Sequence, residues 1–264
     1  MAKKKNSRKK GFLLLHTKKG RLLLGLSILA LLVLLAVLII LNSQKEKHPA
    51  PANESHSEAE RQAPPAFVPT TGTRGQGFSV CLDAGHGGKD PGTSGGGYTE
   101  AEDTLAMTLL IAQCLEAQGC RVVLTRSEDV FLSLEERVDL ANAEGVNALV
   151  SIHRNTVDDA SVGGVEAWIH SAYPSNAAIL SEDILSAIGN TGTMSVSRGV
   201  RFGTSADPSD NYWINRASSM ASCILELGFM SNEADNRAYH DQMGVIAQAV
   251  ADGILDAVSD PQFQ

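Results

Sequence analysis

Three residues that could bind a metal ion or transfer a proton lie at or near the ends of apolar runs typical of strands. His86 follows one run, His153 ends another, and Glu226 lies within a third. Imidazole and carboxylate groups are zinc ligands, and a carboxylate can also act as a general acid or base. Ligand sites of open α/β sheets lie beyond the carboxyl ends of the strands, so we expect these side chains to converge.

Alternating strands and helices between residues 79 and 258 predict an α/β domain with a mainly parallel sheet and helices on both faces. The predicted strands are Ser79 to Asp83, Arg121 to Thr125, Ala148 to His153, Val165 to Ile169 and Cys223 to Leu227. A first helix is predicted over Glu100 to Gln118, with Leu105, Leu109 and Ala112 on its apolar side. A second starts at a capping box formed by Ser133 and Glu136 and carries Leu134, Val138 and Ala141 on one face. Two further helices are predicted over Asn176 to Ile188 and about Met243 to Val258.

The segment from Asp83 to Gly88 is predicted to be a glycine-rich turn after the first strand, which leaves the His86 imidazole uncovered. Asp83 could orient His86 or cap the turn. The glycines do not have the spacing of a phosphate-binding loop.

The N-terminal quarter of the chain predicts a membrane anchor. Residues 22–41 carry no charge, and about 20 residues of helix span a bilayer core. Residues 1–21 hold nine Lys and Arg and no acidic residue, which predicts a cytoplasmic N-terminus. A cleaved signal peptide is the alternative, although its apolar region is normally shorter. Both interpretations carry the rest of the chain across the membrane.

Residues 42–78 are rich in Pro, Ala, Ser, Glu and Gln, which predicts a flexible linker before the domain at 79–258 and a short tail at 259–264. Beyond residue 21 the chain has 13 Lys and Arg against 30 Asp and Glu, a formal charge of −17. This charge argues against nucleic acid as a partner.

Four cysteines are too few for a disulfide scaffold and lack the spacing of a zinc ribbon. We expect them to be small buried side chains. In an exported protein, Cys81 with Cys223 or Cys114 with Cys120 could form a disulfide instead.

Four motifs in order give the sequence a specific resemblance: Asp83 to Asp90 (DAGHGGKD), Glu100 before Leu105, Ser151 to Asn155 (SIHRN) and Leu225 to Asn232 (LELGFMSN). Over about residues 79 to 258 the chain resembles N-acetylmuramoyl-L-alanine amidases of the zinc-dependent, type 3 catalytic family. Val123 to Arg126 with Asp129, and Gly164 to Glu166, also resemble this family.

The resemblance implies that His86, Glu100 and His153 bind Zn²⁺ and that Glu226 is the catalytic carboxylate. The bond cut would be the amide between N-acetylmuramic acid and L-alanine in peptidoglycan. Two histidines and a glutamate suit a catalytic zinc site, which keeps a position for water, and zinc activates that water and polarises the amide oxygen. Glu226 would take up a proton and return it to the departing amine, whereas the alternative is that it only satisfies a buried hydrogen bond.

Two positions near these motifs leave alternatives open. Glu102 and Asp103 lie close to Glu100 and could instead be acids that favour the start of a helix. Arg154 departs from the family, which usually has a small residue after the histidine. Its side chain is predicted to contact substrate carboxylates or to point to solvent.

Substrate contacts are also predicted for Asn155 and for Arg198 and Arg201, which stand where the family has a basic turn that could bind an anionic stem peptide. His170, Trp168, Tyr212 and Trp213 are more typical of core or rim packing than of a glycan groove.

These predictions describe a membrane-anchored peptidoglycan amidase acting outside the cytoplasmic membrane, in wall turnover, daughter-cell separation, sporulation or germination. No long inserted helix is visible between Asn155 and Ser218, so we expect control by location or by a partner protein, an activator that the sequence does not identify. The alternatives are a zinc peptidase or deacylase on the same fold, and a non-catalytic peptidoglycan-binding scaffold.

Overall fold

A computed structural model describes residues 67–194 and 197–263. The predicted basic tail and membrane span, and the linker as far as residue 66, lie outside these residues. Among the helices in the described ranges, none is both long enough and apolar enough to cross a bilayer.

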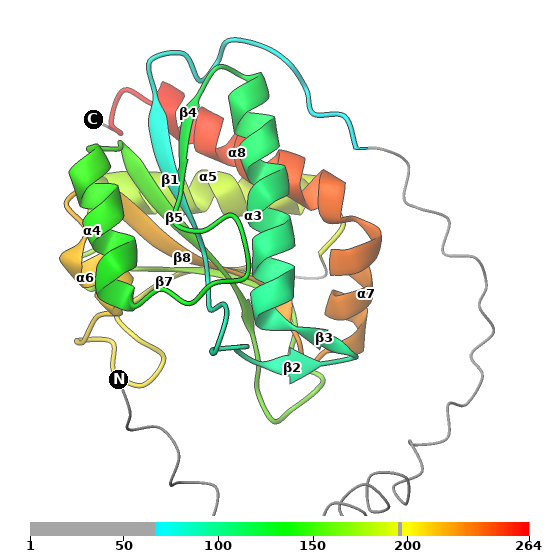
Figure 1. Cartoon of the computed structure of the whole chain (residues 1–264). Coiled ribbons are helices and arrows are strands. Elements are labelled where there is room, and N and C mark those ends of the chain that lie inside the picture. The colour runs from blue at the N-terminus through cyan, green and yellow to red at the C-terminus, as the bar shows by residue number, and fades with distance from the viewer. Residues whose placement is uncertain (1–66, 195–196, 264) are drawn as a thin grey trace, which may run out of the picture. The chain divides into compact units, whose positions relative to one another are not determined.

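The central element is a mixed sheet in which strands far apart in sequence lie side by side (Figure 1). Its strands are β1 (Ser79–Ala84), β4 (Arg121–Leu124), β5 (Ala148–Asn155), β6 (Val165–Ile169), β7 (Ser197–Phe202) and β8 (Ala221–Phe229). They lie in the order β4-β1-β5-β8-β6-β7. All neighbours are parallel except β6 and β8, so β6 and β7 run opposite to the other four strands.

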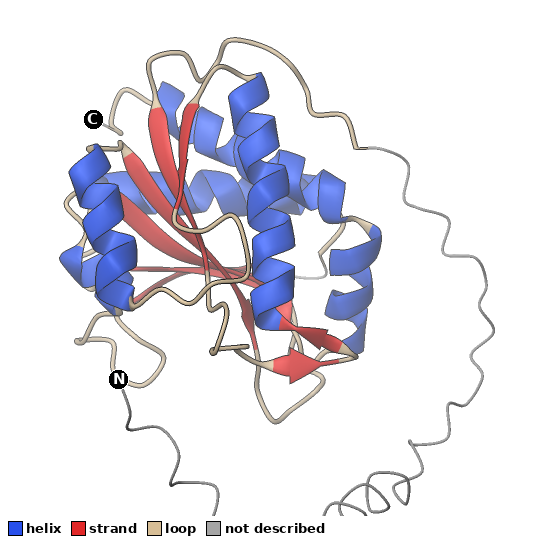
Figure 2. Ribbon diagram, in the orientation of Figure 1, coloured by secondary structure: helices blue, strands red, loops and turns tan. Residues whose placement is uncertain are grey.

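Helices cover both faces of this sheet, as the sequence predicts, and Figure 2 shows the strands as a twisted layer among them. The helices are α3 (Glu100–Ala117), α4 (Leu134–Glu144), α5 (Ser175–Thr191), α6 (Trp213–Ala217), α7 (Glu233–Asp241) and α8 (Met243–Ser259). Apolar residues of α3, α5 and α8 form the larger core on one face. Residues of α4 and α6 form a smaller core on the other.

Local sequence explains where the helices beside the site begin. The Thr99 hydroxyl accepts a hydrogen bond from the backbone N–H of Glu102 and caps α3. The predicted capping box starts α4, because the Ser133 side chain and the Glu136 side chain each accept from the other's backbone N–H. Gly145 in the left-handed conformation ends α4.

Strand alternation decides which side chains face the smaller core and the site. In β5, Val150 and Ile152 pack into the larger core and Leu149 packs into the smaller one. Successive side chains point to opposite faces, so His153 lies on the face of the smaller core and Arg154 on the face of the larger. The same alternation puts Glu226 of β8 on the His153 face.

Several elements differ from the sequence prediction. β7 was predicted as a basic turn, and α6, α7 and the short hairpin β2 (Ser94–Gly95) with β3 (Tyr98–Thr99) were not predicted. These strands and helices are short, so their periodic patterns are weak. The antiparallel course of β6 has a simple cause: the nine residues that join it to β5 are too few for a parallel crossover.

The apolar sides of two helices also differ in detail. Leu105 and Leu109 of α3 are only partly buried, whereas Met107, Ile111 and Leu115 are fully buried. Leu134 of α4 remains 52% exposed, because it lies in the first turn beyond the edge of the smaller core.

The folded unit is longer than predicted at both ends. Residues 67–78 are not a linker: the Gly72 N–H donates to the Ala117 carbonyl, and Phe67 and Phe78 pack against the larger core. Phe263, assigned to the tail, is buried and packs edge-on against Phe78. The polar, proline-rich composition predicted a linker, although Phe67 and Phe78 attach this segment to the domain.

All four cysteines are buried free thiols, so neither alternative disulfide is present in the described structure. Burial raises the pKa of Cys81 and Cys223 to about 12, which leaves both thiols protonated.

Candidate active site

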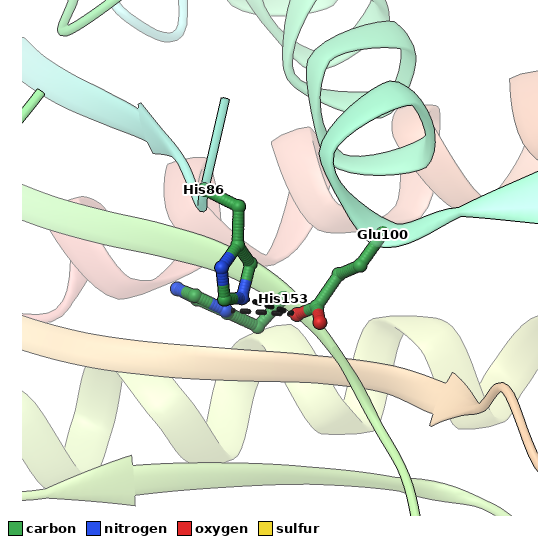
Figure 3. A group of neighbouring side chains, drawn as sticks. All are labelled: His86, Glu100 and His153. Atoms are coloured by element: carbon green, nitrogen blue, oxygen red, sulfur yellow. Dashed lines mark hydrogen bonds and ion pairs between the residues drawn. The ribbon is translucent and has the colours of Figure 1, made fainter. Parts of the chain in front are cut away.

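His86, Glu100 and His153 come from three separate elements and meet at one carboxylate oxygen (Figure 3). Glu100 Oε1 lies 3.1 Å from His86 Nε2 and 3.0 Å from His153 Nδ1. Their potential ligand atoms all lie within 4.8 Å of one another. The three residues therefore offer two nitrogen ligands and one oxygen ligand to a single metal ion.

Two glycines permit this close approach. A Cβ atom at Gly85 would lie 2.3 Å from the His153 ring, and one at Gly92 would lie 2.7 Å from both the Glu100 carboxylate and the His86 ring. His86 itself has a positive φ of 60°, a conformation that is rare for a residue with a side chain. Such strain persists only where the surrounding contacts hold the backbone in place.

Buried donors supply those contacts around the loop after β1. Arg126 Nη2 donates to the Gly85 carbonyl at 2.9 Å, and the Thr104 hydroxyl donates to the same oxygen at 2.8 Å. Arg137 of α4 donates to the His86 carbonyl at 2.7 Å. Two arginines and a threonine thus fix the backbone from which His86 projects.

Asp83 has neither of the roles predicted for it. Its carboxylate accepts from Arg137 Nη1 at 2.7 Å and from the Ser151 hydroxyl at 2.6 Å, and it bonds neither to His86 nor to the turn backbone in the described structure. Side chains alternate between the two faces along β1, so Asp83 points to the face of the sheet that α4 covers. Asp90, which the sequence analysis missed, bonds to His86 Nδ1 instead, at 2.9 Å. Its position four residues after His86 was the available signal.

The structure separates Glu100 from the neighbouring acids. Glu102 is exposed and accepts a hydrogen bond from the Thr99 hydroxyl, and Asp103 forms a buried ion pair with Arg154. Only Glu100 among these three faces the histidines. Its other oxygen accepts from the Thr93 N–H at 3.0 Å, which fixes the carboxylate plane.

The electrostatics fit a metal site of this composition. Burial by itself would lower the pKa of His86, but hydrogen bonds and charge interactions with Glu100 and Asp90 raise it to about 9. Burial by itself would raise the pKa of Glu100, yet both histidines hold it well below its ordinary value. Two histidines and a glutamate with a carboxylate behind one histidine form a donor set suited to Zn²⁺.

Glu226 lies beside this cluster, paired with His153 across β8 and β5. Its Oε2 atom is buried and has no hydrogen-bond partner among the described residues. Burial, with the nearby charges of Glu100 and Glu166, raises the pKa of Glu226 to about 7 against the opposing effect of His153. Glu226 is partly buried, and a carboxylate whose buried oxygen lacks a partner is costly in a purely structural role and suits proton transfer.

A cavity of about 470 Å³ opens beside Glu226. It is lined by Asn155, Thr156, Val157, Glu166, Trp168, Arg198, Arg201, Ser205, Tyr212, Glu226 and Phe229. Three of the four predicted substrate contacts, Asn155, Arg198 and Arg201, are in this wall. Trp168 and Tyr212 also line it, whereas His170 and Trp213 do not.

The prediction for Arg154 is wrong. Its guanidinium is fully buried, donates to Asp103 at 2.6 Å and to Asn236 Oδ1 at 2.7 Å, and lies over the Tyr239 ring. Alternation along β5 directs it to the face opposite His153, where it contacts neither solvent nor the cavity.

Glu166 is a further residue of the site to which the sequence analysis gave no role. It is 4% exposed and accepts hydrogen bonds from Asn155 Nδ2 at 2.9 Å and Trp168 Nε1 at 3.1 Å. It pairs with Glu226 across β6 and β8. The family-like Gly164 to Glu166 motif was the signal that pointed to it.

Comparisons with known proteins agree with this site. Residues 80–256 match the family model described as N-acetylmuramoyl-L-alanine amidase. The uncharacterized protein YqiI of Bacillus subtilis (strain 168) is 35% identical over 182 residues, which cover 68% of this chain and 84% of YqiI. N-acetylmuramoyl-L-alanine amidase LytC of the same strain is 34% identical over 186 residues, which cover 68% of this chain but 35% of LytC.

A solved structure extends the similarity to the fold. N-acetylmuramoyl-L-alanine amidase AmiC2 of Nostoc punctiforme superposes with a TM-score of 0.63 at 34% identity, covering 70% of this chain and 100% of that chain. The matched segment contains the histidine and glutamate cluster, Glu226 and the cavity beside them. By the matched family model, its relatives and its fold, the chain belongs to the family of N-acetylmuramoyl-L-alanine amidases.

Proposed function

We propose that this chain hydrolyses the amide bond between N-acetylmuramic acid and L-alanine in peptidoglycan, using Zn²⁺. The observation that carries the proposal is the convergence of His86, Glu100 and His153 beside Glu226, a partly buried carboxylate whose Oε2 atom has no partner among the described residues. Membership of the amidase family supports the choice of substrate.

In this proposal His86, Glu100 and His153 hold the metal, and neighbouring groups orient His86 and Glu100. Asp90 accepts from His86, and the N–H groups of Thr93 and Arg154 donate to Glu100. When bound, zinc lowers the pKa of water and polarises the amide oxygen.

Glu226 is the proposed general base and acid. Its carboxylate accepts a proton from the water that attacks the lactyl carbonyl, and the C–N bond then breaks as that proton passes to the departing amine of L-alanine. The products are a lactyl carboxylate on the glycan and a stem peptide with a free amino terminus. Glu226 lines the cavity, and no described residue donates a hydrogen bond to its Oε2 atom.

The cavity beside Glu226 is the proposed place for the substrate next to the scissile bond. Trp168 and Tyr212 pack edge-on with ring centroids 5.8 Å apart and supply an apolar wall. Asn155, Arg198 and Arg201 supply polar groups on the same wall. Such a mixture of aromatic surface and a few polar groups is typical of sites that orient a ligand.

We also propose that residues 22–41 anchor the chain in the cytoplasmic membrane with the catalytic domain outside it. The support is the uncharged segment after a basic tail. Protease added to intact protoplasts should digest the catalytic domain and leave the N-terminal tail protected. Digestion of the tail instead would contradict this orientation.

The decisive experiment incubates the full-length chain with purified peptidoglycan, with and without a chelator. The proposal expects new alanine amino termini, no new reducing sugars, and loss of activity on chelation that added zinc restores. New amino termini of other residues would indicate a peptidase, and free hexosamine amines a deacylase. Zinc binding without any cleavage would indicate a scaffold.

Glu226→Gln separates chemistry from metal binding in the same assay. We expect it to retain zinc and lose turnover by about 100-fold or more, because the amide cannot accept the proton. The control is Glu233→Gln on α7, an exposed glutamate whose ion pair is with Arg237 of the same helix. If Glu226→Gln kept the wild-type turnover, Glu226 would not be the group that transfers the proton.

A further inference from the structure

Two arginines of β7 share one buried carboxylate in the wall of the cavity. Arg198 Nε donates to Glu166 Oε2 at 2.9 Å, and Arg201 Nε lies 3.8 Å from the same oxygen. The other oxygen of Glu166 accepts from Asn155 and Trp168. Glu166 therefore connects two cations and two polar side chains of the cavity wall.

A β-bulge is what brings the two arginines together. Residues three apart in a regular strand point to opposite faces. Between β6 and β7 the register moves from Val165 paired with Ser197 to Glu166 paired with Gly199, which leaves Arg198 as an extra residue. Gly199 has a φ of 79°, the left-handed conformation that glycine adopts without strain. The bulge redirects Arg198 to the face of Arg201, a recognised effect of bulges beside active sites.

The two arginines form only some of the hydrogen bonds that their guanidinium groups can donate. Each approaches Glu166 through Nε, and the terminal Nη groups of both have no hydrogen-bond partner among the described residues. The side chains remain 32% and 45% exposed on the cavity. The pair therefore retains unused N–H donors on the cavity, beside the carboxylates of Glu166 and Glu226.

We propose that Arg198 and Arg201 form a carboxylate-binding clamp, positioned by Glu166, that selects stem peptides carrying a free carboxylate close to the scissile amide. This proposal rests on the proposed amidase activity. Guanidinium groups match carboxylates through paired N–H donors, and a carboxamide cannot form the same charge-assisted bonds. Glu226 lines the same cavity, so the bound carboxylate belongs to a residue next to the bond that is cut.

The clamp and a simple neutralisation of the Glu166 charge predict different substrate preferences. If the arginines only balanced the charge of Glu166, replacing a substrate carboxylate by a carboxamide would leave the rate unchanged. With the clamp, the carboxylate substrate is preferred, and the preference depends on both arginines. Arg201 is the better residue to change first, because its contact to Glu166 is long and its side chain is the more exposed.

The test uses the full-length, zinc-loaded chain and two soluble muramoyl dipeptides that differ only in a carboxylate or carboxamide on the second residue. We expect kcat/KM to favour the carboxylate by about tenfold, the range of a partly exposed charge-assisted contact. Arg201→Ala should reduce that ratio by slowing the carboxylate substrate alone, and Arg201→Lys should restore part of it. The matched control is Arg121→Ala, an arginine 51% exposed and paired with Glu144 at the other end of the sheet.

Glu166→Gln tests the positioning role without removing either arginine. The amide can still accept from Asn155 and Trp168 but no longer attracts the guanidinium groups, so the carboxylate preference should fall while zinc content stays the same. Equal rates for the two substrates in the wild type would overturn the clamp. An Arg201→Ala variant that slows both substrates equally would overturn it as well.

Failure of the amidase proposal would look different, because the wild type would then cleave neither dipeptide. Calorimetric binding of the same two compounds still decides the clamp in that case. Tighter binding of the carboxylate by wild type than by Arg201→Ala supports it, and equal binding refutes it.

Discussion

His153 and Arg154 are neighbours in β5, yet one belongs to the metal cluster and the other to the core. Alternation along the strand separates them, since His153 faces Glu226 and Arg154 faces Asp103 and Tyr239 on the opposite side. The long cation beside the histidine is therefore a structural residue.

Arg154→Leu tests that assignment. It leaves the buried Asp103 with only the longer contact to His240, at 3.6 Å, so we expect a loss of about 3 to 5 kcal/mol in the free energy of unfolding. Urea titration measures this loss. Arg201→Ala, which changes a more exposed arginine, should cost less than about 1 kcal/mol. If Arg154→Leu left the unfolding midpoint unchanged and raised KM, Arg154 would be a substrate contact instead.

Glu100 and Glu102 provide a matched pair at the start of α3. Glu100→Gln removes the negative charge of the carboxylate that faces both histidines and should weaken zinc binding by about 100-fold or more, beyond what losing an outer hydrogen-bond partner costs. Glu102→Gln changes an exposed side chain and should leave the affinity unchanged. Competition with a chromogenic chelator measures both, and equal affinities would exclude Glu100 as a ligand.

At the scale of elements, the loop after β1 depends on α4 for its position. Arg137 of α4 is buried and bonds at once to Asp83 in β1 and to the backbone of His86. The capping box at Ser133 starts α4 one turn before Arg137, so a local signal in one element helps to place His86, a proposed metal ligand, in another. This packing explains why a strained backbone at His86 is tolerated.

The ion pair between Asp83 and Arg137 predicts a pH effect on stability. Burial alone would raise the pKa of Asp83, but Arg137 and the hydroxyl donors outweigh it and lower the pKa below 3.8. The stabilisation is therefore complete above about pH 4 and is lost as the pH falls through the lower folded-state value. Asp83→Asn should lower the unfolding free energy at pH 7 and flatten its acid dependence. The exposed Asp139→Asn on α4 should preserve the wild-type curve.

At the scale of the whole domain, the two ends of the folded unit support each other. Phe78 meets Phe263, and the segment from residue 67 bonds to the end of α3 through Gly72 and Thr70. These contacts lie where β1 begins and α3 ends, at the end of the sheet opposite the candidate metal cluster.

A fragment beginning at Ser79 should therefore be less stable than one beginning at Phe67. Phe67 and Phe78 are both only partly buried, so losing their packing should cost less than the roughly 1.5 to 3 kcal/mol per side chain that full burial contributes. Thermal unfolding of fragments 67–264 and 79–264 measures the difference. Equal melting temperatures would show that residues 67–78 do not stabilise the domain and would support the predicted boundary at residue 79.

The sequence by itself determined the family resemblance, the α/β class, both ends of α3 and the start of α4, because these depend on short motifs, periodicity and capping residues. It also identified His86, His153 and Glu226 as residues at strand ends. These features are local, so neighbouring residues contain the information.

The tertiary structure decided what depends on contacts between distant segments. It separated Glu100 from Glu102 and Asp103, buried Arg154, and replaced Asp83 by Asp90 as the partner of His86. The bulge that aligns Arg198 with Arg201 exists only in the pairing of β6 with β7. Register, burial and ion pairing arise between strands and helices far apart in the chain, which is the physical reason that periodicity alone did not reveal them.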